Sequence, residues 1–187
     1  MKSTEESVND LLKDKGGIRL DIGCGAQKHG PDWCGIDIQD LPGVDIIWDF
    51  NQHPWPLPDN SVITAIASHV LEHIPKVVID GGKTRFPFIE FMDEVWRIMK
   101  PDAQFAIAVP HGASPGFMQD PTHAAMINET TFGYFDPLAF DGQLYHFYKP
   151  KPWRIKTDAM GEPFLYFDPG SNLEIVLVKR RMDVSYE

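Results

Sequence analysis

Apolar side chains recur along the chain with two periods, and turns rich in glycine, proline and asparagine separate them. In residues 18–22 apolar and polar positions alternate, which is typical of a β-strand. Residues 62–67 are mostly apolar, as expected for a strand buried on both faces of a sheet. Similar runs predict five further strands, at residues 34–38, 44–48, 105–109, 153–156 and 173–179.

Two stretches carry the helical period instead. In residues 88–99 the apolar positions recur every three or four residues, which predicts a helix that packs one face on the sheet. Near the N-terminus, Ser3 and Glu6 form a capping-box pattern. We therefore expect a helix over about residues 3–13, within an N-terminal element of residues 1–17.

The strand at residues 18–22 runs directly into a Gly-Cys-Gly turn at residues 23–25. Two glycines let the backbone approach a ligand closely, and open parallel sheets bind ligands at this end of the strand. An ordinary tight turn would have the same sequence. A dinucleotide site would need a third glycine where Lys28 stands and a ribose-binding acid about 20 residues on. Asp37 comes only 14 positions after Gly23, so a Rossmann-type NAD-dependent oxidoreductase is disfavoured.

Five motifs in order make residues 18–110 resemble the class I S-adenosylmethionine-dependent methyltransferases. Residues 21–25 match the family's acid, small apolar residue and Gly-X-Gly, and residues 35–38 look like its second strand with the ribose-binding acid. Asp49-Phe50 looks like its adenine-binding pair. Residues 68–74 are similar to its Leu-Glu-His signature, and residues 97–101 match its Arg-X-X-Lys-Pro ending.

This resemblance implies S-adenosylmethionine as the cofactor and S-adenosylhomocysteine as the product. It implies that Asp37 accepts hydrogen bonds from both ribose hydroxyls and that Asp49 takes the adenine amino group, with the Phe50 backbone on the ring edge. For Asp21, orientation of the glycine turn and direct contact with the cofactor both stay open. The cofactor-binding positions it implies are Asp21, Gly23, Cys24, Gly25, Asp37, Ile38, Asp49, Phe50, Ser68 and His69.

The fold that the resemblance implies is α/β and doubly wound. It has a mostly parallel seven-stranded sheet, helices on both faces and an antiparallel last strand, all within one domain of residues 1–187. One departure from the common pattern lies between the first two strands, because Gly30-Pro31 and few helix formers leave room for at most a turn or two of helix. The chain thus resembles a subgroup with an abbreviated first crossover.

The expected reaction moves a methyl group to a hydroxyl or amine of a small-molecule or glycan acceptor. A non-catalytic module that binds S-adenosylmethionine or a partner is the alternative outside enzymes. Residues 111–152 are irregular, with a short helix predicted near Asn128 and an aromatic, proline-bearing segment after it. Such a segment is typical of a lid or an acceptor-site insertion.

Histidines supply the candidates for acid–base chemistry, since a histidine can exchange a proton near neutral pH. His111 follows the predicted fifth strand and is the first candidate for a base, and His123 with Asp120 could form a His-carboxylate pair or stabilise its loop. These three could converge on a metal ion, but no metal-binding spacing supports this, so no metal site is predicted. Glu72 and His73 are expected to hold the start of a helix.

Composition limits the partners and the cellular compartment that we expect for this protein. The formal net charge of −10 disfavours nucleic acid and anionic membranes as partners, although the basic residues between Lys149 and Lys156 leave a local patch open. No apolar run is long enough to span a bilayer. The two cysteines suit a reducing compartment, so a cytoplasmic protein is expected. We expect Cys24 to fill the turn rather than act as a nucleophile. The oligomeric state stays open.

Overall fold

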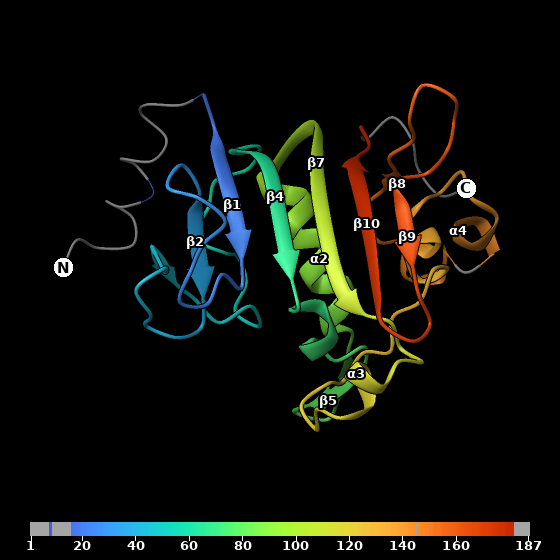
Figure 1. The fold of residues 1–187 in the computed structure, drawn as a ribbon, viewed down its shortest axis with the longest axis horizontal. Coiled ribbons are helices and arrows are strands. Elements are labelled where there is room, and N and C mark those ends of the chain that lie inside the picture. Colours follow the sequence, from blue (N-terminus) through green and yellow to red (C-terminus); the bar gives the residue numbers. More distant parts are fainter. Residues whose placement is uncertain (1–7, 9–15, 145, 182–187) are drawn as a thin grey trace.

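The computed structural model describes residue 8, residues 16–144 and residues 146–181. An eight-stranded sheet forms the centre of the molecule (Figure 1). Its strands are β1 (Ile18–Ile22), β2 (Cys34–Asp37), β3 (Ile46–Ile47), β4 (Val62–Ser68), β7 (Met99–Pro110), β8 (Trp153–Ile155), β9 (Leu165–Phe167) and β10 (Asn172–Lys179). A separate hairpin pairs β5 (Val78–Asp80) with β6 (Lys83–Arg85).

The strand order is β3-β2-β1-β4-β7-β10-β8, and β9 also pairs with β10. The first five of these strands run parallel to one another, whereas β10 runs antiparallel to β7. β8 pairs with residues 177–179 and β9 with residues 173–175, both on the edge of β10 that β7 leaves free. The eight strands therefore fill seven positions, which confirms the predicted mostly parallel sheet with an antiparallel last strand.

One long helix covers one face of the sheet. Helix α2 (Pro87–Ile98) lies behind β4 and β7 in Figure 1, as its apolar period predicts. The loop between β3 and β4 packs on the same side, where Trp55 is buried against Phe91. The Trp55 amide donates to Glu94 Oε1 at 2.6 Å, and Arg97 Nη2 donates to the Trp55 carbonyl at 3.1 Å. This loop thus takes the place that a helix would otherwise fill.

The other described helices are short: η1 (Leu71–His73), α3 (Pro115–Met118), η2 (Thr131–Phe135), α4 (Phe140–Leu144) and η3 (His146–Tyr148). η2 confirms the short helix predicted near residue 128. Its Phe132 and Phe135 are buried and pack near Phe88 of α2, so this part of the predicted insertion belongs to the core. The helix predicted over residues 3–13 lies outside the described residues except for Val8, which is buried.

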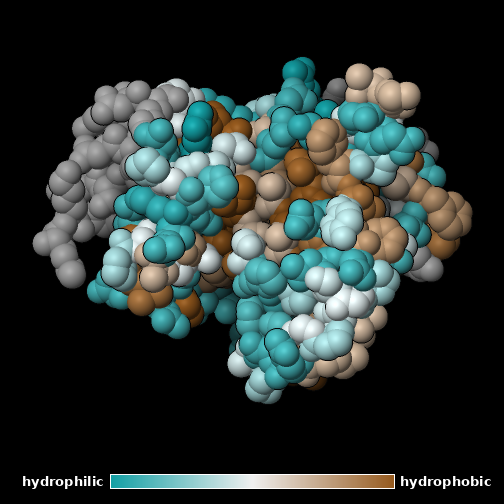
Figure 2. All heavy atoms as spheres, in the orientation of Figure 1, coloured by the Kyte–Doolittle hydropathy of each residue, from teal (hydrophilic) through white to brown (hydrophobic). Residues whose placement is uncertain are grey.

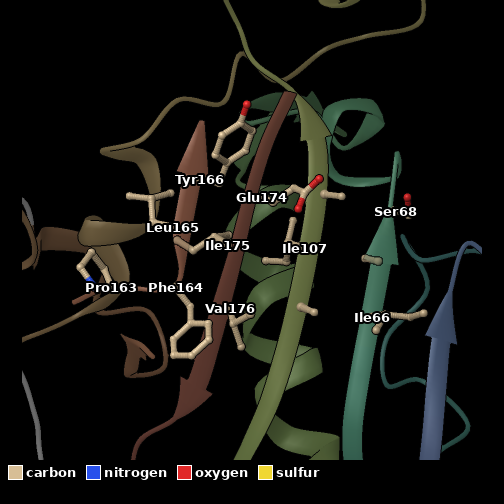
Figure 3. A pocket seen from close by; sticks show the side chains of 13 residues that line it. Ile66, Ser68, Ile107, Pro163, Phe164, Leu165, Tyr166, Glu174, Ile175 and Val176 are labelled. Carbon is tan, nitrogen blue, oxygen red and sulfur yellow. The ribbon is translucent and has the colours of Figure 1, made fainter. Parts of the chain in front are cut away.

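Within the described part of the chain, the opposite face of the sheet is uncovered over β4, β7 and β10. Along these three strands, buried side chains alternate with half-buried or exposed ones. Thr64 and Ile66 on β4 are among the half-buried side chains. Apolar surface is visible in the middle of this face (Figure 2), and a pocket of about 490 Å³ lies over Ile66, Val176 and Phe164 (Figure 3).

Two predictions therefore need correction. β4 is buried on one face and not on both, and among the described residues helices do not cover both faces of the sheet. The physical reason lies in the connections after β1 and β2, which contain no helix in the described part of the chain. The prediction of a short first crossover is confirmed. No helix among the described residues has the length and apolar character that a membrane span needs.

Candidate functional site

The carboxyl ends of β1, β4 and β7 meet at one edge of the sheet, beside α3 (Figure 1). At this edge the glycine turn after β1 lies against the end of β2. The Gly25 amide donates to Asp37 Oδ2 at 3.0 Å, and the Gln39 amide donates to Asp37 Oδ1 at 3.0 Å. One carboxylate therefore holds both the turn and the start of the next loop.

Gly23 and Gly25 both have positive φ angles, 68° and 56°, which favour glycine. A Cβ atom at Gly23 would lie 2.3 Å from Cγ2 of Val70, so the turn packs directly on the segment that follows β4. A Cβ atom at Gly25 would meet nothing within 4 Å. The backbone at Gly25 thus faces open space, as a turn that approaches a ligand must.

Asp21 and Cys24 support the turn from inside. Asp21 is buried, and its Oδ2 accepts the His29 amide at 2.6 Å, while burial raises the pKa of its carboxyl. Cys24 is also buried, and burial with the nearby Asp21 raises its pKa to about 11. A thiol with so high a pKa is a poor nucleophile at neutral pH, so Cys24 packs the turn as expected. Asp21 orients the crossover at His29.

The remaining predicted cofactor positions lie at the ends of β2 and β3. Ile38 is 57% exposed although it is apolar, and it directly follows Asp37. Asp49 accepts the amide of Asn51 at 2.9 Å through Oδ1. The ring of Phe50 packs against Trp55 inside the protein, with centroids 5.1 Å apart, so only the Phe50 backbone is left to contact a ligand.

Ser68 and His69 follow at the carboxyl end of β4, and both are exposed. His69 has a φ angle of 58°, which is uncommon for a residue with a side chain and frequent at functional sites. Its amide donates to the Ala108 carbonyl at 2.8 Å, which fixes the backbone to β7. His69 Nδ1 lies 3.2 Å from Oε1 of Glu72, whose side chain is fully buried.

A polar pocket of about 410 Å³ opens beside His69. It brings Asp120 and His123 next to His73, whose ring centroid lies 4.7 Å from that of His123. Asp120 accepts hydrogen bonds from the hydroxyl and the amide of Thr122, and these bonds lower the pKa of its carboxyl. The lining residues are His69, Glu72, His73, Pro110, Gly116, Gln119, Asp120, His123 and Asn172.

His111 is not among these lining residues. It is buried; its Nδ1 accepts the Ala113 amide at 3.2 Å, and its Nε2 lies 3.0 Å from Glu129 Oε2. Because Nδ1 accepts, the neutral ring carries its proton on Nε2 and donates it to Glu129. Neither nitrogen is then left to take a proton from an acceptor. The structure therefore brings His123 and Asp120 together and places His111 apart from them.

No protein-family model matches this sequence, and no curated protein gives a significant match. Solved structures do match. The crystal structure of an S-adenosylmethionine-dependent methyltransferase from Archaeoglobus fulgidus aligns with a TM-score of 0.55 at 17% identity, over 94% of this chain and 92% of that one. The fold is that of the class I methyltransferases.

Two further solved structures with this methyltransferase fold are of proteins named for different acceptors. One is a 16S rRNA (adenine(1408)-N(1))-methyltransferase from Catenulisporales acidiphilia with its cosubstrate, with a TM-score of 0.53 at 12% identity over 95% of this chain and 91% of that one. The other is a possible histamine N-methyltransferase from Thermotoga maritima, at 0.52 and 13% over 95% and 88%. Identity this low supports the shared fold and leaves the acceptor open.

Glu72 and His73 belong to a polar cluster that was not predicted from the sequence. The signal that could have found them is the spacing His69-X-X-Glu72-His73, which places three ionisable side chains within five residues. Their neighbour His123 comes 50 positions after His73, so no local pattern shows that it joins them.

Proposed function

We propose that this protein is an S-adenosylmethionine-dependent methyltransferase whose acceptor is a hydroxyl or amine of a small molecule or a glycan. The observation that carries the proposal is the contact between the Gly25 amide and Asp37, which joins the glycine turn to the end of β2. This contact lies at the same edge of the sheet as the polar pocket beside His69.

The residues at this edge fit the cofactor. Each Asp37 oxygen accepts one amide and keeps a second lone pair, so the carboxylate can still accept the two ribose hydroxyls. The exposed side chain of Ile38 offers an apolar surface for the adenine ring. Asp49 Oδ1 accepts the Asn51 amide at 2.9 Å, and its carboxylate would also accept the adenine amino group.

S-adenosylmethionine supplies a methyl group that its positive sulfur already activates. The protein then has to align the acceptor, and alignment of this kind contributes at most about 7 to 11 kcal/mol. A proton must also leave a hydroxyl or amine acceptor. His69 is exposed, lies at the end of β4 and has the buried Glu72 carboxylate beside its Nδ1, so we assign it the proton-accepting role in place of His111.

The pocket and the charge of the protein support a small acceptor. A volume of about 410 Å³ suits a small molecule or one sugar unit, and the histidine, carboxylate and amide lining can bind hydroxyl groups. The net charge of −10 opposes a long nucleic-acid backbone.

Thermal unfolding with added ligands tests the proposal. At roughly 100 times its dissociation constant, S-adenosylhomocysteine should stabilise the protein by about 2.7 kcal/mol, which is a rise of roughly 5–10 °C for a chain of this size. NAD should give no rise. Transfer of labelled methyl groups over a panel of sugars, amines and phenols then identifies the acceptor.

The two possible negative results support different alternative functions. A rise with NAD and none with S-adenosylhomocysteine would support the oxidoreductase. A rise with S-adenosylhomocysteine, but no labelled product with any acceptor, would support a non-catalytic binding module.

A further inference from the structure

We propose that Glu72, His73 and His123 bind one divalent metal ion at the edge of the polar pocket. One ligand atom from each of these residues lies within 4.8 Å of the other two. Two of the residues come from η1 at the end of β4, and the third comes from the segment after α3. Burial, histidine tautomers, loop anchoring and ligand type each support a metal ion at this place.

The Glu72 carboxylate is the first ligand of the proposed site. Its side chain is fully buried, and among the described residues neither of its oxygens has a hydrogen-bond partner. His69 Nδ1 lies 3.2 Å from Oε1, but this contact does not have the geometry of a hydrogen bond. A buried carboxylate without a partner is costly, so one that persists calls for a cation.

The tautomers of the two histidines suit metal binding. His123 Nδ1 lies 2.9 Å from the Phe117 carbonyl, which can only accept, so this nitrogen carries the proton. His73 Nδ1 lies 3.0 Å from the Thr122 hydroxyl, which donates its own proton to Asp120 Oδ1 at 2.6 Å and therefore accepts from His73. Both rings are left with a lone pair on Nε2. Metal-binding histidines show this pattern, in which the other ring nitrogen donates to an oxygen.

Backbone hydrogen bonds anchor the two segments to each other. The amides of Ala124 and Ala125 both donate to the Glu72 carbonyl, at 2.7 and 2.9 Å. These bonds hold His123 beside η1 even though the two segments are far apart in the sequence. The three ligands are therefore positioned before any ion binds, and closing them around an ion needs movements of about an ångström, because ligands at 2.0–2.2 Å from Zn²⁺ lie roughly 3.5 Å apart.

The ligand set fits some divalent ions better than others. Two imidazole nitrogens and a carboxylate favour first-row ions such as Zn²⁺, Co²⁺ and Mn²⁺ over Mg²⁺ and Ca²⁺, which prefer oxygen. Asp120 Oδ2 lies 3.7 Å from His123 Nε2, so a second carboxylate stands beside the cluster without belonging to it. The ion would still have an open position toward the pocket, where an acceptor oxygen can bind.

The role of the ion rests on the proposed function, whereas its binding does not. An acceptor hydroxyl bound to the ion would lose its proton more easily, and His69 would take that proton. The test is therefore metal binding itself, measured without cofactor or acceptor.

Chelator-treated protein is titrated with Zn²⁺ in a calorimeter and with Co²⁺ by visible absorption. We expect one ion per chain and Co²⁺ absorption bands typical of nitrogen and oxygen ligands. His123→Ala should weaken Zn²⁺ binding by roughly 100-fold or more, and Thr122→Val, which removes the hydroxyl behind His73, by roughly 10-fold. His53→Ala is the control, because it removes an exposed histidine outside the cluster.

Glu72→Gln tests whether the carboxylate binds the ion. Its Zn²⁺ affinity is compared only if its far-ultraviolet circular dichroism matches that of the unaltered protein. If the spectra differ, His123→Ala and Thr122→Val decide the proposal. The proposal is overturned if the unaltered protein binds no Zn²⁺, or if His123→Ala binds it as tightly as His53→Ala. Protein that binds Zn²⁺ but shows no thermal shift with S-adenosylhomocysteine keeps the metal site and loses the proposed function. Protein that shows the thermal shift with S-adenosylhomocysteine but binds no Zn²⁺ loses the metal site and keeps the proposed function.

Discussion

The carboxylate of Asp37 connects two segments that meet only in the folded protein. Its oxygens hold the amides of Gly25 and Gln39, and the same oxygens face the edge where a ligand would bind. A substitution there removes two kinds of hydrogen bond at once, those within the protein and those to the ligand. The proposed ribose contact therefore has to be measured against a control from the same loop.

Asp37→Ala should weaken binding of S-adenosylhomocysteine by roughly 10- to 100-fold, because hydrogen bonds to a charged group contribute about 1.5–3 kcal/mol. Isothermal calorimetry measures the affinity. Asp40→Ala makes the same change of charge at an exposed position three residues away and should leave the affinity unchanged. Affinity of Asp37→Ala within twofold of the control would remove Asp37 from the binding site.

Single residues differ in how well the sequence predicts them. Asp21, Cys24 and Asp37 could be placed from the sequence, because their neighbours lie within the same short motif and the next strand. The surroundings of Glu72 could not be predicted from the sequence. Its neighbour His123 belongs to a distant segment, which is held beside Glu72 by a backbone hydrogen bond from Ala124. Contacts that depend on tertiary packing leave no periodic signal.

Among the elements, α2 is predicted almost residue for residue, because a long apolar period is a strong signal. The strand β9 is missed. Its three residues, Leu165-Tyr166-Phe167, show no alternation between apolar and polar, and pairing with β10 alone defines it. The β5–β6 hairpin is missed as well, although Gly81-Gly82 between two short runs is a known hairpin signal.

Asp93 on α2 gives a prediction about pH. Burial raises the pKa of its carboxyl to about 6, although the Lys151 amide donates to it at 2.6 Å. Because the folded state holds this proton more tightly than the unfolded state, the group stabilises the fold most below about pH 4. That contribution is lost as the pH rises through 6. Asp93→Asn stays neutral and keeps an acceptor for the Lys151 amide.

Urea unfolding of the unaltered protein, of Asp93→Asn and of a control variant, each at pH 4 and at pH 7.5, measures this effect. Relative to the unaltered protein, Asp93→Asn should gain up to about 3 kcal/mol in unfolding free energy between the two pH values, at about 1.4 kcal/mol per unit of pKa shift. Asp40→Asn, at an exposed carboxylate, should show no such gain. Parallel pH curves for all three proteins would contradict the shifted pKa.

For the whole molecule, the sequence predicts the mostly parallel sheet with its antiparallel last strand, but not which of its faces helices cover. This sheet is implied by motifs that each follow one strand, and the observed topology and the fold comparison support it. Whether helices cover a face of the sheet depends on the segments that connect the strands. Among the described residues, the segments after β1 and β2 are too short to carry a helix over the open face. The apolar character of residues 62–67 therefore indicates a strand in the centre of the sheet and not burial on both sides.

Two valines on neighbouring strands test the one-sided core. Val109 on β7 is fully buried on the side of α2, whereas Val176 on β10 is half-buried in the pocket of the open face. Val109→Ala should lower the unfolding free energy by about 2 kcal/mol, through lost apolar burial and the cavity left behind. Val176→Ala should cost less than about 1 kcal/mol, because water already reaches its side chain. Both are measured by urea unfolding, and equal costs would show that the open face is covered in solution.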